Sequence, residues 1–289
     1  MAALVGCSRF SPSAKPNGST AVRIEIMTDT VNQLLTLAHE LGREDRHLAI
    51  LGEGNVSARL DGGLFAVKAS GTRLAALEAG QVTICRSDKV LPLLEKRLLT
   101  DTAVESALLE ARVDSNAPRP SIEAVFHAWL LTVHEVRFVG HCHPLGVCQV
   151  LCSPRARDFA EQRMFPDEIV FCGPASVYVP YADPGLPLAW QIRERTRDFM
   201  NLQGRVPRLI LLQNHGVIAL GSTPEEVLAS VLMAEKAARI FAGAAAMGGP
   251  NFLLPQHVER IAGRPSDLFD KSDKSDRSDR SGPFTSSFS

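Results

Sequence analysis

The stretch Val136-Arg-Phe-Val-Gly-His-Cys-His-Pro144 joins a short apolar run to two histidines, and it predicts a β-strand over residues 136–143. Successive side chains of a strand point to opposite faces, so His141 and His143 share one face, with Cα atoms roughly 6.6 Å apart. Two imidazoles at that spacing can bind a single metal ion at about 2.0–2.1 Å. Alone, a His-x-His pair is more often two ordinary hydrogen-bonded histidines, so further residues are needed to choose.

A third histidine lies further along the chain, where Asn-His-Gly (214–216) separates two apolar runs. The runs 209–212 and 217–220 predict a hairpin, because the glycine supplies the positive φ that a tight turn needs. His215 at the tip of this turn is a third metal ligand if the fold brings the turn to the strand. Three protein ligands leave one position open, which is typical of a catalytic rather than a structural metal ion.

The clearest helix of the sequence carries a glutamate near its start. Apolar residues between 122 and 133 recur at helical spacing and Ser121 is a suitable N-cap, so a helix is predicted over 121–133. Glu123 lies in its first turn at the edge of the apolar stripe, where partial desolvation suits a general base. Taken alone, this position is more often explained by simple attraction of a carboxylate to the helix N-terminus. His127 is predicted to be a supporting or packing residue rather than a metal ligand.

Two loops of small and hydroxylated residues lie next to predicted strands, Gly52-Glu-Gly-Asn-Val-Ser57 and Ser70-Gly-Thr72. Such loops can expose backbone N–H groups that bind a phosphate, although each is more often an ordinary turn. Neither contains the Gly-Lys-Ser/Thr of a Walker loop, and neither matches GxGxxG.

The order of the predicted elements indicates the fold class. Helices alternate with short strands and local hairpins, which favours a three-layer α/β/α sandwich around a mixed, largely antiparallel central sheet. Besides the segments above, strands are predicted at 48–51, 56–60, 64–68 and twice within 168–180, and helices at 30–41, 87–98, 102–112, 144–152, 186–202 and 223–246.

We expect one domain over residues 27–264, between a disordered leader (1–26) and a disordered charged tail (265–289). The tail repeats Asp-Lys-Ser and Asp-Arg-Ser units and has too few apolar residues to bury. The leader holds serines and a few basic residues but lacks the continuous apolar block of a secretory signal.

Charge and composition argue against two classes of partner. The chain has 289 residues with 31 Lys and Arg against 32 Asp and Glu, so no basic excess points to nucleic acid. Its apolar runs are strand-sized, far below the ~20 residues of a membrane span. The six cysteines show no disulfide-framework or CxxC spacing, which favours reduced thiols and a cytoplasmic location.

Six motifs in a fixed order resemble the class II aldolase/adducin family over about residues 30–245. They are Gly-x-Gly-Asn-Val-Ser (52–57), Lys-Ala-Ser-Gly-Thr (68–72), Pro-Ser-Ile-Glu (120–123), His-Cys-His-Pro (141–144), Pro-Tyr-Ala-Asp-Pro-Gly (180–185) and Asn-His-Gly (214–216).

The resemblance implies a role for each of the residues singled out above. It implies that a divalent metal ion, usually zinc, is bound by His141, His143 and His215, and that Glu123 is the acid–base residue. The implied ligands of a substrate phosphate are Asn55, Ser70, Gly71 and Ser121.

Two positions depart from the family pattern. Ile122 stands where sugar-phosphate aldolases of the family carry a second serine before the glutamate, so one phosphate-binding hydroxyl is absent. The C-terminal tail has no tyrosine, and neither Tyr178 nor Tyr181 is assigned as a proton donor.

The activity implied by the resemblance is reversible aldol cleavage of a ketose, as its 1-phosphate, through an enediolate stabilised by the metal ion. Epimerase, dehydratase or decarboxylase chemistry on the same core is the alternative, although epimerases of the family usually place an aspartate near the position of Glu123. A non-catalytic interaction domain, as in adducin heads, is another alternative, but those heads lack the metal-binding histidines. The family also implies a homotetramer with the site at a subunit boundary.

Overall fold

The computed structural model describes residues 18–96 and 99–263, and within them seven strands form one sheet in the order β3-β2-β1-β4-β7-β6-β5. Neighbouring strands are antiparallel except for β5 and β6, which are parallel. The strands are β1 (Asn55–Leu60), β2 (Leu64–Lys68), β3 (Val82–Arg86), β4 (Phe138–Cys142), β5 (Val177–Val179), β6 (Leu209–Leu212) and β7 (Gly216–Gly221).

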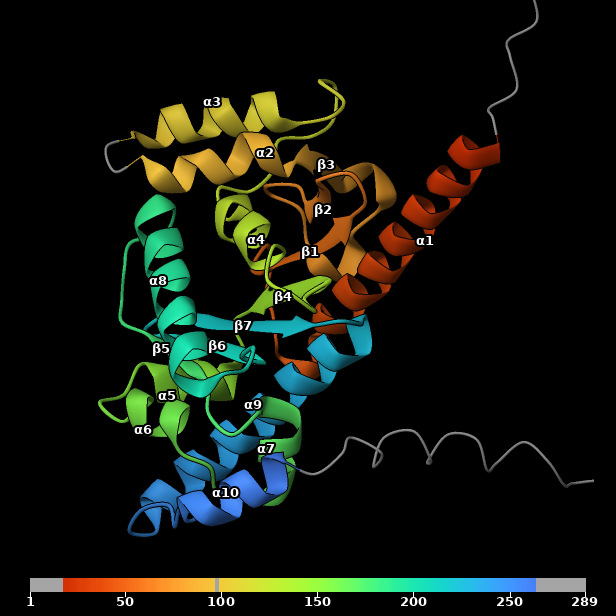
Figure 1. Cartoon of the computed structure of the whole chain (residues 1–289). Helices are drawn as coiled ribbons and strands as arrows, with labels where there is room; N and C mark the ends of the chain where they lie inside the picture. The colour runs from red at the N-terminus through yellow and green to blue at the C-terminus, as the bar shows by residue number, and fades with distance from the viewer. Residues whose placement is uncertain (1–17, 97–98, 264–289) are drawn as a thin grey trace, which may run out of the picture.

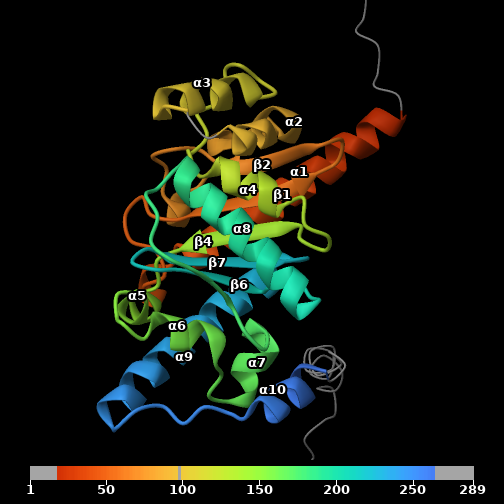
Figure 2. The ribbon, with the colours of Figure 1, turned by 60° about the vertical axis from the view of Figure 1, so that its left-hand side comes forward.

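Helices cover both faces of the sheet (Figures 1 and 2). One core lies between the sheet and α1, α5 and α9, and the other lies between the sheet and α3, α4 and α8. The helices are α1 (Gly18–Leu41), α2 (Ser87–Val90), α3 (Asp101–Ala111), α4 (Ala124–Leu130), α5 (Leu145–Leu151), α6 (Ala156–Glu161), α7 (Pro166–Cys172), α8 (Leu186–Gln203), α9 (Pro224–Ala246) and α10 (Pro255–Ala262).

The central strands are apolar because both of their faces are covered. Every residue of β6 and β7 is buried. Alternate residues enter the two cores, so that Val56 packs toward α1 while the neighbouring Asn55 faces the α4 side, opposite His141 of β4.

The chain segments that carry the predicted site meet at one end of the central strands β1, β4 and β7. Because β1 runs antiparallel to both β2 and β4, its first residue, Asn55, lies beside the ends of those two strands. The start of β7 also meets the end of β4, where Val217 pairs with Cys142. The sheet therefore brings together loops that are far apart in the sequence.

The sheet confirms the predicted fold class, a three-layer sandwich around a mixed, largely antiparallel sheet. The predicted strands at 56–60, 64–68, 209–212 and 217–220 are present, as are the long helices at 186–202 and 223–246. Across residues 18–96 and 99–263, no helix combines the length and apolarity that a membrane crossing requires.

Three predictions of local structure are wrong. Residues 48–51 form an irregular loop rather than a strand, and Leu51 has a positive φ of 57°. The first strand predicted within 168–180 is part of helix α7, because Pro166 at the first turn and acidic residues after it favour a helix start. Helix α1 begins at Gly18 rather than at residue 30, so residues 18–26 do not belong to a disordered leader.

Other differences concern element boundaries. The helix predicted at 87–98 is divided into α2 and a 3-10 turn, Leu91–Glu95, that contains Pro92. Strand β3 and helices α6 and α10 have no counterpart among the predicted elements. The remainder of the predicted leader (1–17) and the predicted tail (265–289) lie outside the described residues.

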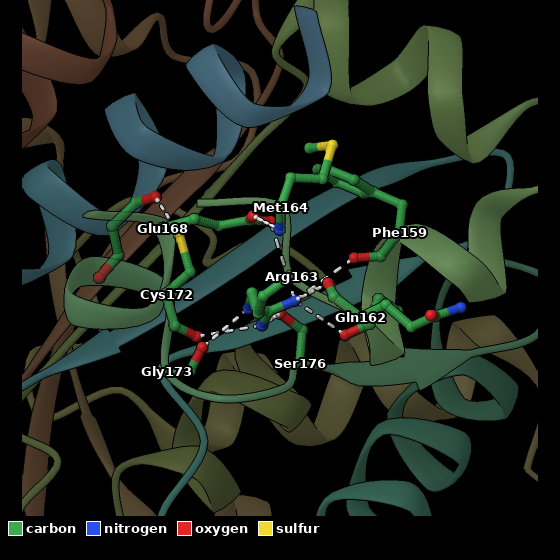
Figure 3. A network of polar contacts seen from close by, with 10 residues as sticks. Phe159, Gln162, Arg163, Met164, Glu168, Cys172, Gly173 and Ser176 are labelled. Atoms are coloured by element: carbon green, nitrogen blue, oxygen red, sulfur yellow. Dashed lines mark hydrogen bonds and ion pairs between the residues drawn. The ribbon is translucent and has the colours of Figure 1, made fainter. Parts of the chain in front are cut away.

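A buried arginine ties together the segment that precedes β5 (Figure 3). Arg163 is 1% exposed, and its guanidinium donates to the carbonyl oxygens of Gly173 (2.8 Å) and Gln162 (2.9 Å) and to Ser176 Oγ (2.8 Å). The buried carboxylate of Glu168 lies 4.0 Å away and accepts a hydrogen bond from the backbone N–H of Met164. These bonds satisfy charges that would otherwise be costly in the core.

Candidate metal centre

The structure brings the three predicted histidines together where the central strand β4 ends and β7 begins. His141 is in β4, His143 directly follows that strand, and His215 lies in the turn between β6 and β7. The ring centroids are 4.9 to 5.0 Å apart in all three pairs. One nitrogen from each ring can be chosen so that all three lie within 4.8 Å of one another.

The turn that carries His215 is held against the helix that follows His143. The N–H of Asn214 donates to the carbonyl oxygen of Leu151, and Cys148 Sγ donates to that of His215 at 3.3 Å. The next residue must be glycine, because a Cβ at Gly216 would lie 2.5 Å from the His143 ring. Helix α5 therefore fixes the distance between the two ligand-bearing segments.

The orientation of two rings suits a divalent cation. His141 Nδ1 lies 3.0 Å from the carbonyl oxygen of Val217, which can only accept, so Nδ1 carries a proton and Nε2 is the nitrogen left for a metal ion. His141 Nε2 lies 3.1 Å from His143 Nε2. Two nitrogens bound to a tetrahedral ion at 2.0–2.1 Å are about 3.3 Å apart, so the separation fits such an ion.

Two of the three rings are held in the neutral form that a metal requires. Burial, with smaller contributions from the neighbouring histidines, lowers the pKa of His143 to about 4 and that of His215 to about 4. Burial lowers the pKa of His141, but the charge and hydrogen bond of Glu123, together with the Val217 carbonyl oxygen and the charge of Glu53, raise it more, so its net pKa is above the usual value.

Glu123 lies beside the histidines with its carboxylate facing His141. Its Oε1 is 3.4 Å from His141 Nε2, and its Oε2 accepts a hydrogen bond from Asn55 Nδ2 at 3.4 Å. Burial raises the pKa of Glu123, but the charge and hydrogen bond of His141, helped by His127 and His215, lower it more. The side chain is therefore a partly buried anion, close enough to act on a substrate bound beside the histidines.

The local structure at Glu123 differs from the prediction. Helix α4 begins at Ala124 rather than at residue 121, so Glu123 is the N-cap residue and not part of the first turn. Ser121 does not cap the helix; its Oγ accepts a hydrogen bond from the N–H of Glu123 at 3.3 Å. This contact orients the backbone of the glutamate.

Three of the four predicted phosphate ligands lie on two adjacent segments. Ala69 forms a β-bridge with Pro120, and the N–H of Ser70 donates to the carbonyl oxygen of Arg119, so Ser70 and Gly71 lie near Ser121. Ser70 and Gly71 are exposed, and Gly71 has a φ of +76° that favours glycine. The N–H of Ser70 is already occupied, which leaves its hydroxyl for a ligand.

The fourth predicted phosphate ligand, Asn55, differs from the others because it is fully buried. Its Nδ2 contacts Glu123, whereas its Oδ1 has no hydrogen-bond partner among the described residues. Ile122, which replaces a serine of the family pattern, packs beside Gly185 and extends the α4-side core. The hydroxyl missing at 122 is thus exchanged for an apolar contact.

Sequence reasoning missed Lys68, which lies at the end of β2. Its side chain is 3% exposed, and Nζ donates to the carbonyl oxygen of Thr72 at 2.8 Å. Burial lowers its pKa, while the charge of Glu123 opposes that change. It is the one charged residue of the predicted strand 64–68, which is otherwise apolar, and this could have identified it as a candidate.

Comparisons with known proteins identify a family and similar folds. A family model described as Class II Aldolase and Adducin N-terminal domain matches residues 32–242. The chain is 29% identical over 203 residues to the Uncharacterized oxidoreductase YuxG of Bacillus subtilis (strain 168), a match that covers 68% of this chain but only 27% of that protein.

Two solved structures show the same fold at low sequence identity. An L-fuculose 1-phosphate aldolase has a TM-score of 0.61 with 18% identity, and the match covers 81% of this chain and 95% of the other. YgbL of Escherichia coli, a candidate aldolase/epimerase/decarboxylase, has a TM-score of 0.60 with 17% identity, covering 82% and 99%.

Proposed function

Because the chain belongs to the class II aldolase and adducin family, we propose that it is a metal-dependent lyase that reversibly cleaves a carbon–carbon bond of a ketose. The observation that carries this proposal is the convergence of His141, His143 and His215 beside the carboxylate of Glu123. Three imidazoles leave a coordination position for substrate, and an adjacent anionic carboxylate supplies an acid–base group.

Different residues would have different roles in this reaction. The three histidines would hold a divalent cation, for which zinc suits the all-nitrogen donor set. When bound, the cation supplies a Lewis acid for the substrate carbonyl. Glu123 would carry the proton that is added to or removed from the carbon next to that carbonyl. Asn55 donates a hydrogen bond to its carboxylate, and Ser121 accepts one from its backbone N–H.

The substrate we propose is a sugar phosphate. Ser70, Gly71 and Ser121 lie on adjacent segments near Glu123, where a hydroxyl and backbone N–H groups can bind a phosphate. Support also comes from the similar structure of an L-fuculose 1-phosphate aldolase. A homotetramer and a cytoplasmic location are further proposals, which rest on the family resemblance and on the free thiols of the described cysteines.

Epimerase, dehydratase or decarboxylase chemistry is the second candidate, because the same histidines and carboxylate could serve each reaction. It is favoured by the similarity to YgbL, a candidate for aldolase, epimerase and decarboxylase activities. A non-catalytic adducin-like role is less well supported, since all three histidines are present and lie close together.

A screen of phosphorylated and free ketoses with the metal-loaded protein tests the proposal. We expect a three-carbon fragment from one of them, and Glu123→Gln should retain the metal but lose activity about 100-fold or more. Loss of water or carbon dioxide without fragmentation would favour the second candidate. Activity of Glu123→Gln within about threefold of the wild type would rule out the acid–base role.

A further inference from the structure

The outer nitrogen of His143 faces a carboxylate that sequence reasoning did not assign. His143 directs Nε2 toward His141 Nε2, so its Nδ1 points away from the shared centre. Glu53 Oε1 lies 3.8 Å from this Nδ1. This distance is within ion-pair range but longer than a hydrogen bond. The two side chains are only partly exposed, at 39% for Glu53 and 23% for His143.

The loop that carries Glu53 is attached directly to the segment that carries His143. The N–H of His143 donates to the carbonyl oxygen of Leu48 at 2.9 Å, and that of Leu145 donates to His47 at 3.2 Å. Within the loop, Glu53 Oε2 accepts a hydrogen bond from the N–H of Ile50 at 2.9 Å. One carboxylate oxygen is therefore tied to the loop, and the other faces the imidazole.

Three residues of this loop adopt backbone conformations with positive φ. His47 and Leu51 both have positive φ, 52° and 57°, in a conformation that side chains other than glycine rarely adopt. Gly54, at φ 78°, approaches so closely that a Cβ would lie 2.7 Å from the carbonyl oxygen of His141. Such conformations persist where surrounding contacts determine them, and they concentrate at functional sites.

We propose that Glu53 is a positioning residue for His143, holding its ring so that Nε2 is presented to the divalent cation. This inference rests on the metal centre of the proposed function. His141 has a corresponding outer partner in the carbonyl oxygen of Val217. A carboxylate does the same for His143 and adds a negative charge, which raises the basicity of the ligand and favours a bound cation.

The affinity of the full-length protein for Co²⁺ and Zn²⁺, measured by chelator competition without substrate, tests the proposal. We expect Glu53→Ala to weaken binding about 10- to 100-fold, the usual effect of removing such an outer partner. Glu53→Gln, which keeps an acceptor for the Ile50 N–H, should show a smaller loss. Glu44→Gln removes an equal charge from the exposed preceding turn, and its affinity should stay within about twofold of the wild type.

X-ray absorption of the Co²⁺ protein separates positioning from direct ligation. Wild type and Glu53→Ala should have the same number and type of first ligands, with greater disorder of the imidazole shell in the variant. Loss of an oxygen ligand in Glu53→Ala would overturn the proposal by making Glu53 a ligand. Equal affinities of Glu53→Ala and wild type, with matched thermal unfolding of the metal-free proteins, would overturn it as well.

The same data distinguish this inference from the proposed function. If the wild type binds no Co²⁺, both are wrong. If it binds Co²⁺ and depends on Glu53 but cleaves no ketose, only the lyase activity is wrong.

Discussion

Ser57 Oγ and His127 Nδ1 form a 2.7 Å hydrogen bond between β1 and α4, and neither side chain reaches solvent. Two residues before Ser57, Asn55 contacts Glu123, which lies four residues before His127. Two residues along a strand span about 6.6 Å, which is similar to the rise of about 5.4 Å over one helical turn. The two contacts therefore lie side by side and both join β1 to the segment of α4. This pair of contacts sets the position of Glu123 over the histidines.

The buried state of His127 predicts a pH dependence of stability. Burial lowers its pKa from 6.5 to about 3 in the folded protein. Between those values the unfolded chain binds a proton that the folded protein does not, so stability falls as the pH is lowered through 6.5. Between pH 7.5 and pH 5, this residue alone should cost about 2 kcal/mol of the free energy of unfolding.

Urea denaturation of the metal-free protein at both pH values measures that change. The variant His127→Asn cannot titrate, so its free energy of unfolding should fall less over the same interval, whatever its absolute stability. Parallel pH curves for the two proteins would mean that His127 is not held neutral by burial.

Removal of His215 should abolish tight metal binding, because only His141 of β4 and His143 directly after it remain, and the third ligand comes from the distant turn. We expect His215→Ala to lose most of its metal during dialysis, as measured by elemental analysis. His134→Ala, which removes a histidine whose side chain is 92% exposed, is the matched control and should retain the metal. Full occupancy of His215→Ala would show that the turn is not part of the centre.

Substitution of Ser70 should selectively weaken the binding of a phosphorylated ligand. Its hydroxyl is exposed beside Gly71 and the segment of Ser121, so Ser70→Ala should raise the inhibition constant of a sugar phosphate about tenfold. The corresponding free sugar should be unaffected. Ser106→Ala on α3, where the hydroxyl bonds to its own helix, provides a control. If Ser70→Ala raised the inhibition constants of the sugar phosphate and the free sugar equally, Ser70 would not bind the phosphate group.

Replacement of Arg163 should destabilise the fold without removing the metal centre. Arg163→Met would leave the buried Glu168 without its cationic neighbour and several carbonyl oxygens without donors, a loss of about 3–5 kcal/mol in the free energy of unfolding. Thermal and urea unfolding measure the change. Arg157→Met, in the same segment but 64% exposed, should have little effect. Similar losses in both variants would contradict a special role for the buried network.

Local patterns predicted several parts of the fold correctly. The helical spacing after Pro224 and the two apolar runs around His215 gave α9, β6 and β7, because periodicity and turn residues act over a few positions. The apolar run at 169–172 predicts a strand but lies in helix α7, since a short run fits a strand or a helix equally well until its packing is known.

The sequence by itself determined that His141 and His143 lie two residues apart at the end of a strand, although the strand stops at Cys142 rather than at His143, and that His215 lies in a turn. Only the tertiary structure decided that these residues meet, that Glu123 faces His141, and that Glu53 lies behind His143. In each of these contacts, residues are joined that are separated in the chain by whole strands and helices, and the order of strands in the sheet brings them together. That order depends on which apolar faces cover one another, and a local pattern of residues does not specify it.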